Sequence, residues 1–182
     1  MLIRLASKLE RGSIVDGQGI RAVIWTQGCP HNCPYCHNPE THDYNGGVLV
    51  DVESLKKEIN LLDSEEGVTF SGGDPFEQPK ACSDLAKYCH KVNLNVWCYT
   101  GYTYEQLLKK AKEDSNVMDF LREIDVLVDG RFVFKLKSLD IRFRGSKNQR
   151  IIDVKASLEK NKVIILDMDN VDSRNKKEKI YI

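Results

Sequence analysis

The sequence predicts an α/β protein, and more narrowly a partial (open) β/α barrel, on three observations. Strand-like apolar runs alternate with helical periodicity, which is the pattern of parallel strands joined by crossover helices. The chain has 182 residues, whereas a full eight-unit barrel needs about 250. Polar or glycine-rich loops follow the predicted strands, where parallel β/α folds build their sites. A flavodoxin-like doubly wound sheet is the alternative architecture.

The first predicted elements are a strand, a turn and a helix. Residues 20–28, "IRAVIWTQG", form a strand that runs into a cysteine-rich loop. The Asn-Gly-Gly at 45–47 indicates a turn. In "DVESLKKEINLLD", residues 51–63, Asp51 is the expected N-cap of a helix. One face of that helix carries the apolar side chains of Val52, Leu55, Ile59 and Leu62.

The next elements repeat the order of strand, loop and helix. "GVTFSGGD" at 67–74 is a strand entering a glycine loop, and "PKACSDLAKYCHKV" at 79–92 is a helix. "LNVWCYTGY" at 94–102 is a third strand. The apolar stripe of the helix contains Cys82, Leu85, Cys89 and Val92. Because buried free cysteine behaves as a small hydrophobe, we expect Cys82, Cys89 and Cys98 in the core.

The last third of the chain predicts a helical region and two further strands. The helix spans about 104–124, "DVLVDGRF" at 125–132 is a strand with its loop, and "DIRFRGSKNQRIID" at 140–153 is another strand and loop. A charged tail begins at about Asp167. We find no internal repeat and no linker-like segment, so we expect a single domain over residues 1–182.

Composition excludes several classes of partner. The 27 basic and 27 acidic residues cancel, so no global field attracts nucleic acid or an anionic membrane. No apolar run approaches the roughly 20 residues of a membrane helix, and the N-terminus is too charged for a secretory signal. We therefore expect a cytoplasmic protein. Because that compartment is reducing, the six cysteines indicate metal or redox chemistry rather than disulfides.

Three cysteines in "GCPHNCPYC" form the strongest chemical motif. Cys29, Cys33 and Cys36 have the spacing Cys-x3-Cys-x2-Cys, within a loop stiffened by two prolines. Thiolates hold iron-sulfur clusters of the cubane type, and three protein ligands leave one iron open to a substrate. Two alternatives remain: chance clustering, and a structural zinc site completed by a histidine. The candidate fourth zinc ligands are His31, His37 and His42.

Five loops after predicted strands describe one large site on the carboxyl-end rim. They are "GCPHNCPYC", "SGGD", "TGY", "DGR" and "RGSKNQR". Thr100 and Ser146 are candidates for binding a ligand, although such hydroxyls often cap backbone. Asp129 is a candidate too, with an ordinary Asp-Gly turn as its alternative. Arg144 and Arg150 are expected to form surface salt bridges rather than to hold an anion.

The cysteine motif, with Tyr35 before its last cysteine, resembles the radical S-adenosylmethionine (radical SAM) superfamily. The resemblance implies that the three cysteines bind a 4Fe-4S cluster and that SAM occupies the open iron. It also implies reductive cleavage of SAM to methionine and a 5′-deoxyadenosyl radical, which needs a closed site. Tyr35 is then expected to lie against the adenine.

A second motif, "SGGD" at residues 71–74, resembles the Gly-Gly-Glu segment of that superfamily, with Asp in place of Glu. The resemblance implies that Gly72, Gly73 and Asp74 receive the amino group of SAM. Thr100 and Asp129 are further expected cofactor-binding residues on the same rim. Paired glycines alone are also common in plain turns.

Six segments within residues 14–153 resemble one branch, the activating proteins of anaerobic (class III) ribonucleotide reductases. They are "VDGQGIR", "CHNPET", "VTFSGGDP", "YTGY", "DVLVDGRF" and "RGSKNQRIID". Gln18 stands where that branch has proline, and the tail after Leu166 matches nothing recognised. Only 35 residues separate Cys36 from Gly72, so no ferredoxin-like domain is inserted and one cluster is expected.

The branch implies an enzyme that generates a glycyl radical on the large subunit of the reductase, which is its protein substrate. Reduced flavodoxin or ferredoxin is the implied electron donor. One alternative is activation of another glycyl radical enzyme, such as pyruvate formate-lyase. A different class is a non-catalytic iron-sulfur or zinc protein, which would not need a glycine loop beside the cysteines.

Overall fold

An open eight-stranded sheet is the centre of the computed structural model, which describes residues 1–170. The strand order is β4-β1-β3-β5-β6-β7-β8, and β2 pairs with β3 beside this path. The strands are β1 (Leu2–Leu5), β2 (Glu10–Ser13), β3 (Arg21–Thr26), β4 (Val48–Asp51), β5 (Gly67–Gly72), β6 (Asn95–Tyr99), β7 (Val126–Asp129) and β8 (Arg150–Asp153).

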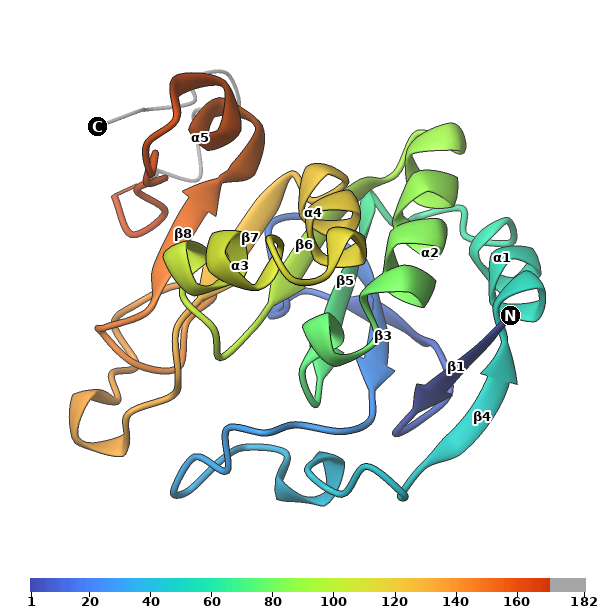
Figure 1. Ribbon diagram of the computed structural model, residues 1–182, viewed down its shortest axis with the longest axis horizontal. Helices are drawn as coiled ribbons and strands as arrows, with labels where there is room; N and C mark the ends of the chain where they lie inside the picture. Colours follow the sequence, from blue (N-terminus) through green and yellow to red (C-terminus); the bar gives the residue numbers. More distant parts are fainter. Residues whose placement is uncertain (171–182) are drawn as a thin grey trace.

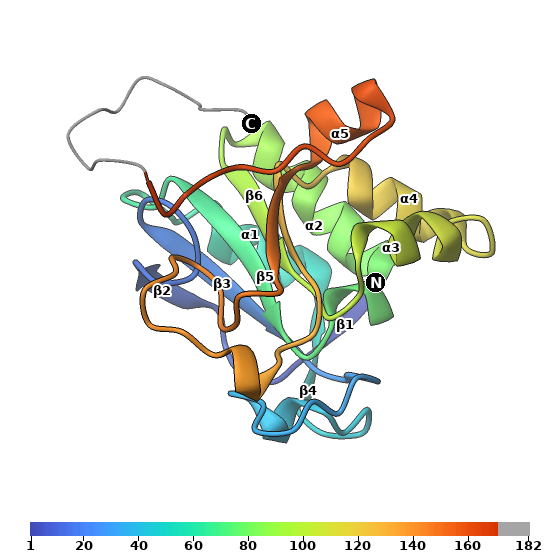
Figure 2. The same cartoon turned by 90° about the vertical axis from the view of Figure 1, so that its left-hand side faces the viewer.

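Five α-helices accompany the described sheet. They are α1 (Val52–Ile59), α2 (Pro79–Lys91), α3 (Tyr104–Lys110), α4 (Ser115–Arg122) and α5 (Val154–Lys160). Figures 1 and 2 show α1 to α4 gathered on one side of the sheet. A doubly wound fold needs helices on both faces, so the open-barrel prediction is confirmed. No helix within residues 1–170 is long and apolar enough to cross a membrane.

The middle strands β3, β5, β6 and β7 run parallel, as the alternation of apolar runs and helices predicts. Val68 pairs with Ala22 on one side and Val96 on the other, and all three are fully buried. The predicted helix at 104–124 is two helices, because residues 111–114 separate α3 from α4. The parallel strands place four of their carboxyl ends on one rim.

The sequence prediction missed β1, β2 and β4, which extend the sheet by antiparallel pairing. Each has only four residues, and β2 (ERGS) has no apolar side chain, so no period-2 pattern marks it. Asp51 does precede α1, but its carboxylate accepts from the N-terminal ammonium and not from the helix. Leu62 lies beyond the end of α1 and is half-buried.

The predicted strand at 140–143 is absent, and the loop of residues 140–149 leads into β8 instead of following a strand. Because β8 is antiparallel to β7, its first residue, Arg150, pairs with Asp129 at the end of β7. The loop therefore lies on the predicted rim, but it precedes β8 instead of following a strand. The expected tail after Asp167 lies mainly outside the described residues.

The main core lies between the sheet and the helix layer. Phe120 of α4 packs on Phe70 of β5 and on Phe76, with ring centroids 5.3 and 4.8 Å apart. Cys82, Cys89 and Cys98 are fully buried, which confirms them as core residues. Burial raises the pKa of the Cys89 thiol to about 12, so it remains a neutral apolar side chain.

Candidate active site

The cysteine loop, residues 28–41, crosses the carboxyl ends of the parallel strands and is anchored at both ends. The Gly28 N–H donates to the Thr41 carbonyl at 2.8 Å, and the Cys29 N–H donates to the His42 carbonyl at 3.2 Å. Gly28 has φ +97°, and a Cβ there would lie 2.8 Å from the Tyr44 ring. The sequence folds here because only glycine allows this approach at that backbone angle.

The three predicted ligands of this loop are half-buried thiols, and none is in a disulfide. Burial raises the pKa of Cys29 to about 11, and the neighbouring Cys33 and Cys36 add to the shift, so the three sulfurs lie within electrostatic reach. The Asn38 N–H donates to the Cys36 sulfur at 3.5 Å. The backbone N–H groups of His31 and Phe132 oppose the rise in the pKa of Cys29 and Cys33, respectively.

This donor set fits a 4Fe-4S cluster. The thiolates of a cubane bind different irons, so they need not meet at one point, and N–H donors to sulfur tune the cluster. A zinc site instead needs four donors around one ion. His31 Nε2 lies 2.7 Å from Asp74, and the His37 ring packs on Phe132.

The glycine loop after β5 is bonded directly to the start of the cysteine loop. The Gly73 N–H donates to the Thr26 carbonyl at 2.7 Å, and the Asp74 N–H donates to the Gly28 carbonyl at 2.8 Å. Gly72 has φ +99°, and a Cβ on Gly73 would lie 2.4 Å from the Gly28 oxygen. The two predicted motifs are therefore in contact, and the paired glycines are needed for close packing of backbone on backbone.

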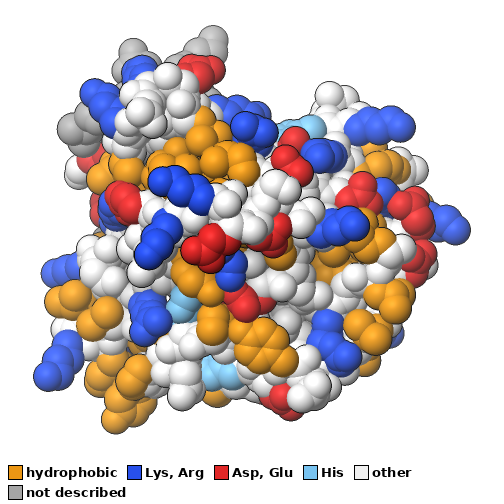
Figure 3. Space-filling model, viewed as in Figure 1, with side chains coloured by type: hydrophobic (Ala, Val, Ile, Leu, Met, Phe, Trp, Pro, Cys, Tyr) orange, Lys and Arg blue, Asp and Glu red, His pale blue; other side chains and the backbone are white. Residues whose placement is uncertain are grey.

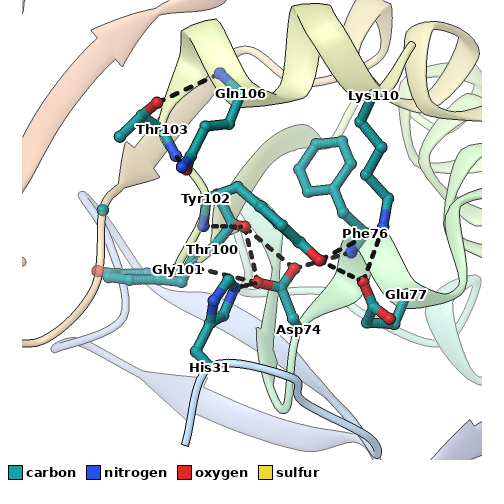
Figure 4. A network of polar contacts seen from close by, with 12 residues as sticks. His31, Asp74, Phe76, Glu77, Thr100, Gly101, Tyr102, Thr103, Gln106 and Lys110 are labelled. Atoms are coloured by element: carbon teal, nitrogen blue, oxygen red, sulfur yellow. Dashed lines mark hydrogen bonds and ion pairs between the residues drawn. The ribbon is translucent and has the colours of Figure 1, made fainter. Parts of the chain in front are cut away.

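Asp74 is the centre of a buried polar network (Figure 4). Its carboxylate accepts from Thr100 Oγ1 at 2.8 Å, from the Gly101 N–H at 3.0 Å and from the Phe76 N–H at 3.0 Å. The fourth neighbour is His31, from the cysteine loop. Asp74 thus joins the cysteine loop, the glycine loop and the loop after β6. The predicted residue Thr100, directly after β6, donates one of these hydrogen bonds. Contact of either residue with SAM stays a prediction.

His31 is the residue of this network whose part the sequence does not reveal. Its side chain is only 5% exposed, and its Nδ1 has no hydrogen-bond partner among the described residues. Its ring meets the Tyr102 ring edge-on, with centroids 4.5 Å apart. The only sequence evidence for a role of His31 is its position within the cysteine motif. That position is compatible with a histidine that flanks the cluster and equally with one that binds zinc.

Asp129 is a buried carboxylate whose partners also belong to the chain. It accepts from the Tyr104 N–H at 2.7 Å, at the start of α3, and from Arg150 Nε at 3.0 Å. Arg150 also pairs with Glu105, so the expected salt bridge is confirmed, although one of its partners is buried. Arg144 pairs with Asp169, which confirms the same expectation for it.

A polar cavity of about 380 Å³ lies beside Asp129 on the rim. Gly101, Thr103, Arg131 and Asn148 are among its other lining residues. Ser146, predicted as a ligand or a cap, is fully buried away from it and accepts from the Val133 N–H at 3.1 Å. Its capping alternative therefore describes the structure.

Tyr35 is the most exposed of the predicted site residues, at 72%. It has φ +59°, and its ring packs on Phe134 with centroids 4.4 Å apart. His37 packs on Phe132 at 4.7 Å. These two aromatic contacts join the cysteine loop to the segment after β7. Contact of Tyr35 with adenine stays a prediction.

An open β/α sheet with three half-buried thiols in one rim loop suits a single-cluster iron-sulfur protein. Residues 15–152 match the model of the family described as "4Fe-4S single cluster domain". The chain is 33% identical over 145 residues to the anaerobic ribonucleoside-triphosphate reductase-activating protein of Escherichia coli (strain K12), covering 75% of this chain and 90% of that protein. The chain therefore belongs to the family of these activating proteins, and the radical SAM resemblance is confirmed.

Two further comparisons are more partial. The pyruvate formate-lyase-activating enzyme of Clostridium pasteurianum is 37% identical over 118 residues, which cover 60% of this chain and 50% of that enzyme. The crystal structure of QueE from Escherichia coli aligns with a TM-score of 0.47 and 17% identity, over 57% of this chain and 54% of that one.

Proposed function

We propose that this protein activates an anaerobic ribonucleoside-triphosphate reductase by generating a glycyl radical on it. Its cofactors are a 4Fe-4S cluster and S-adenosylmethionine. The observation that carries the proposal is the direct bonding of the glycine loop to the cysteine loop through Gly28. When bound and reduced, the cluster supplies the electron that cleaves SAM to methionine and a 5′-deoxyadenosyl radical, which removes hydrogen from a glycine Cα.

Three thiols and an open position are the first part of this site. Cys29, Cys33 and Cys36 would hold the cluster, and three protein ligands would leave one position for SAM. The Asn38 N–H donates to the Cys36 sulfur at 3.5 Å. In this proposal Tyr35 covers the adenine once SAM is bound, exchanging part of its exposed surface for that contact.

The glycine loop is the second part, as a backbone shelf for the amino group of SAM. Gly72 and Gly73 bring the backbone close, and Asp74 positions the shelf through Thr100 and Gly101. The contact between His31 and Asp74 fixes the cysteine loop relative to this shelf. Such a tie matters because reacting groups must be held about 3 to 3.5 Å apart. Asp129 positions the start of α3 and the wall of the polar cavity.

The proposed substrate is a loop on the large subunit of the reductase, which presents the glycine. The chain covers 90% of the reductase-activating relative but only half of the lyase-activating one, which supports the reductase. We further propose a single domain, a cytoplasmic location, and flavodoxin or ferredoxin as the electron donor. A non-catalytic iron-sulfur protein is disfavoured because it would not need a glycine shelf bonded to its cysteine loop.

The test uses the anaerobically reconstituted protein with SAM, dithionite and purified partner enzymes. We expect an electron paramagnetic resonance signal of a glycyl radical on the anaerobic reductase of the same organism. Little or none is expected on pyruvate formate-lyase. Efficient glycyl radical formation on pyruvate formate-lyase would instead assign the protein to the lyase-activating enzymes. Absence of SAM cleavage would support the non-catalytic alternative.

A further inference from the structure

The segment after β7 exposes apolar side chains beside the cysteine loop. Residues 131–139, including the short helix η3 (Phe134–Leu136), together with Tyr35 are here called the η3 surface. Its exposed apolar residues are Tyr35 (72%), Val133 (36%), Phe134 (51%), Leu136 (41%) and Leu139 (92%). Figure 3 shows hydrophobic and basic side chains mixed over this corner, at the lower left. Adjacent exposed apolar groups with a polar rim are typical of protein contact sites.

The η3 surface is also strongly basic, although the whole chain has no net charge. Residues 131–139 contain three basic side chains and no acidic one. Arg131, Lys135 and Lys137 are exposed and form no ion pair within residues 1–170. A patch with unpaired cations favours, and steers toward itself, a partner with an acidic surface.

This surface lies against the cluster ligands but away from the glycine shelf. Phe134 packs on Tyr35, between Cys33 and Cys36, and Phe132 packs on His37, directly after Cys36. The glycine loop instead contacts Gly28, at the start of the cysteine loop. A partner on the η3 surface is therefore close to the cysteine loop without contacting the glycine loop, which the proposed function assigns to SAM.

We propose that the η3 surface docks an acidic electron-carrier protein that reduces the cluster; this rests on the proposed function. In the step, the partner's cofactor is oxidised by one electron and the bound cluster is reduced by one. No bond forms or breaks, and no proton moves at the surface. The mixed apolar and basic character suits a small, transient interface, as electron-transfer encounters have.

Binding is the first test, with the anaerobically reconstituted protein and the flavodoxin and ferredoxin of the same organism as probes. We expect K135E/K137E to weaken the Kd for the physiological carrier at least tenfold at low salt, with a smaller difference at high salt. The matched control, K109E/K112E, makes the same charge change at two exposed lysines in and just after α3. It should stay within twofold of wild type. An equal loss in both variants would overturn the docking site.

An apolar pair separates contact from charge alone. Leu139→Ser removes a 92% exposed side chain of the η3 surface, and Leu61→Ser removes a 70% exposed one beyond α1. We expect weaker carrier binding, by about threefold or more, only for Leu139→Ser. Unchanged binding in Leu139→Ser would contradict an apolar contribution at this surface.

Reduction kinetics separate the carrier from the protein substrate. In K135E/K137E, cluster bleaching by the reduced carrier should slow at least tenfold, while bleaching and glycyl radical yield with dithionite stay at wild-type levels. A loss of radical yield with dithionite and unchanged carrier binding would overturn the proposal and assign the surface to the reductase. If wild type forms no glycyl radical yet shows the carrier effects, docking holds and the proposed function fails.

Discussion

The two ends of the parallel strands each bury a charged side chain, and they treat it differently. At the amino end, Arg21 of β3 is fully buried and donates to Thr69 Oγ1 at 2.6 Å and to Asn95 Oδ1 at 2.8 Å. It also donates to the carbonyls of Gln18 and Val68. Burial lowers its pKa to about 10, which still leaves it charged at neutral pH.

At the carboxyl end, the buried carboxylate of Asp74 is part of a hydrogen-bond network that is incomplete. His31 bonds to Asp74 through one ring nitrogen and leaves the other without a partner among residues 1–170. Three half-buried thiols lie in the same loop as His31. Arg21 donates to partners in β5, β6 and the loop before β3, whereas His31 keeps one ring nitrogen available to a ligand. We therefore expect changes at the first end to alter stability and changes at the second to alter cofactor binding.

The largest expected effect is loss of the cluster at the carboxyl end. The purified anaerobic protein should contain about four irons per chain. Replacing Cys29, Cys33 or Cys36 by Ala should abolish this, while Cys82→Ala should leave it intact because Cys82 is a core residue. Iron analysis and the visible spectrum measure the cluster content of each variant. Retained iron in Cys29→Ala, or lost iron in Cys82→Ala, would contradict the ligand assignment.

A side chain at Gly73 should disturb the cysteine loop as well as the shelf. If Gly73 served only to receive SAM, Gly73→Val would impair SAM binding without removing iron. The structure indicates a wider effect, because the new Cβ would lie 2.4 Å from the Gly28 oxygen. We expect lower iron content together with weaker SAM binding, measured on the same reconstituted samples. Full iron with weakened SAM binding would restore the simpler expectation.

At the amino end, Arg21→Met should lower stability without affecting iron. The substitution leaves buried acceptors in β5 and β6 without donors, each worth about 1–3 kcal/mol. We expect a loss of roughly 3 kcal/mol or more in the free energy of unfolding, measured by urea denaturation. Arg122→Met is the control, because that side chain is 65% exposed. Equal stability of the two variants would remove the distinction between the ends.

Asp74→Asn tests the tie between the two loops with a smaller change of shape. The amide retains one acceptor but loses the charge that receives hydrogen bonds from Thr100, Gly101 and His31. We expect about 2 kcal/mol lower stability. SAM binding should weaken by about tenfold, which corresponds to about 1.4 kcal/mol, with iron retained. Asp119→Asn, at a half-exposed position of α4, should match wild type in both titrations.

The smallest effect is the pH dependence of the ion pair at the rim. Hydrogen bonds from Arg150 lower the pKa of Glu105 from 4.5 to about 2. Because the folded pKa is the lower one, the carboxylate stabilises the protein above pH 4.5 and loses this contribution as the pH falls toward 2. Since Glu105 is 57% exposed, its contribution is below about 1 kcal/mol. The stability difference between wild type and Glu105→Gln should shrink over that range; a constant difference would contradict it.

The sequence predicted the parallel part of the fold because β3, β5, β6 and β7 are apolar runs with helices between them. It missed β1 and β2 because four-residue strands with charged side chains are too short to show that pattern. The sequence also could not show that β8 pairs antiparallel with β7. The turn residues at 145–149 predict a loop before β8 whether the pairing is parallel or antiparallel.

The site was predictable where residues are close in the chain. The thiol spacing of Cys29, Cys33 and Cys36 is local, and so is the glycine pair. The burial of Asp74 was not predictable, because its partners His31 and Thr100 are 43 and 26 residues away. The η3 surface depends on packing between the cysteine loop and the segment after β7, which no local pattern encodes.

The central claim is that hydrogen moves from a glycine of the reductase to the 5′-deoxyadenosyl group formed on this protein. The direct measurement uses reductase purified from cells supplied with α-deuterated glycine. This reductase reacts with the protein, SAM and dithionite, and mass spectrometry then measures deuterium in the 5′-deoxyadenosine. We expect the 5′-deoxyadenosine to carry one deuterium, in step with growth of the glycyl radical signal. Unlabelled 5′-deoxyadenosine in the presence of that labelled reductase would contradict the account.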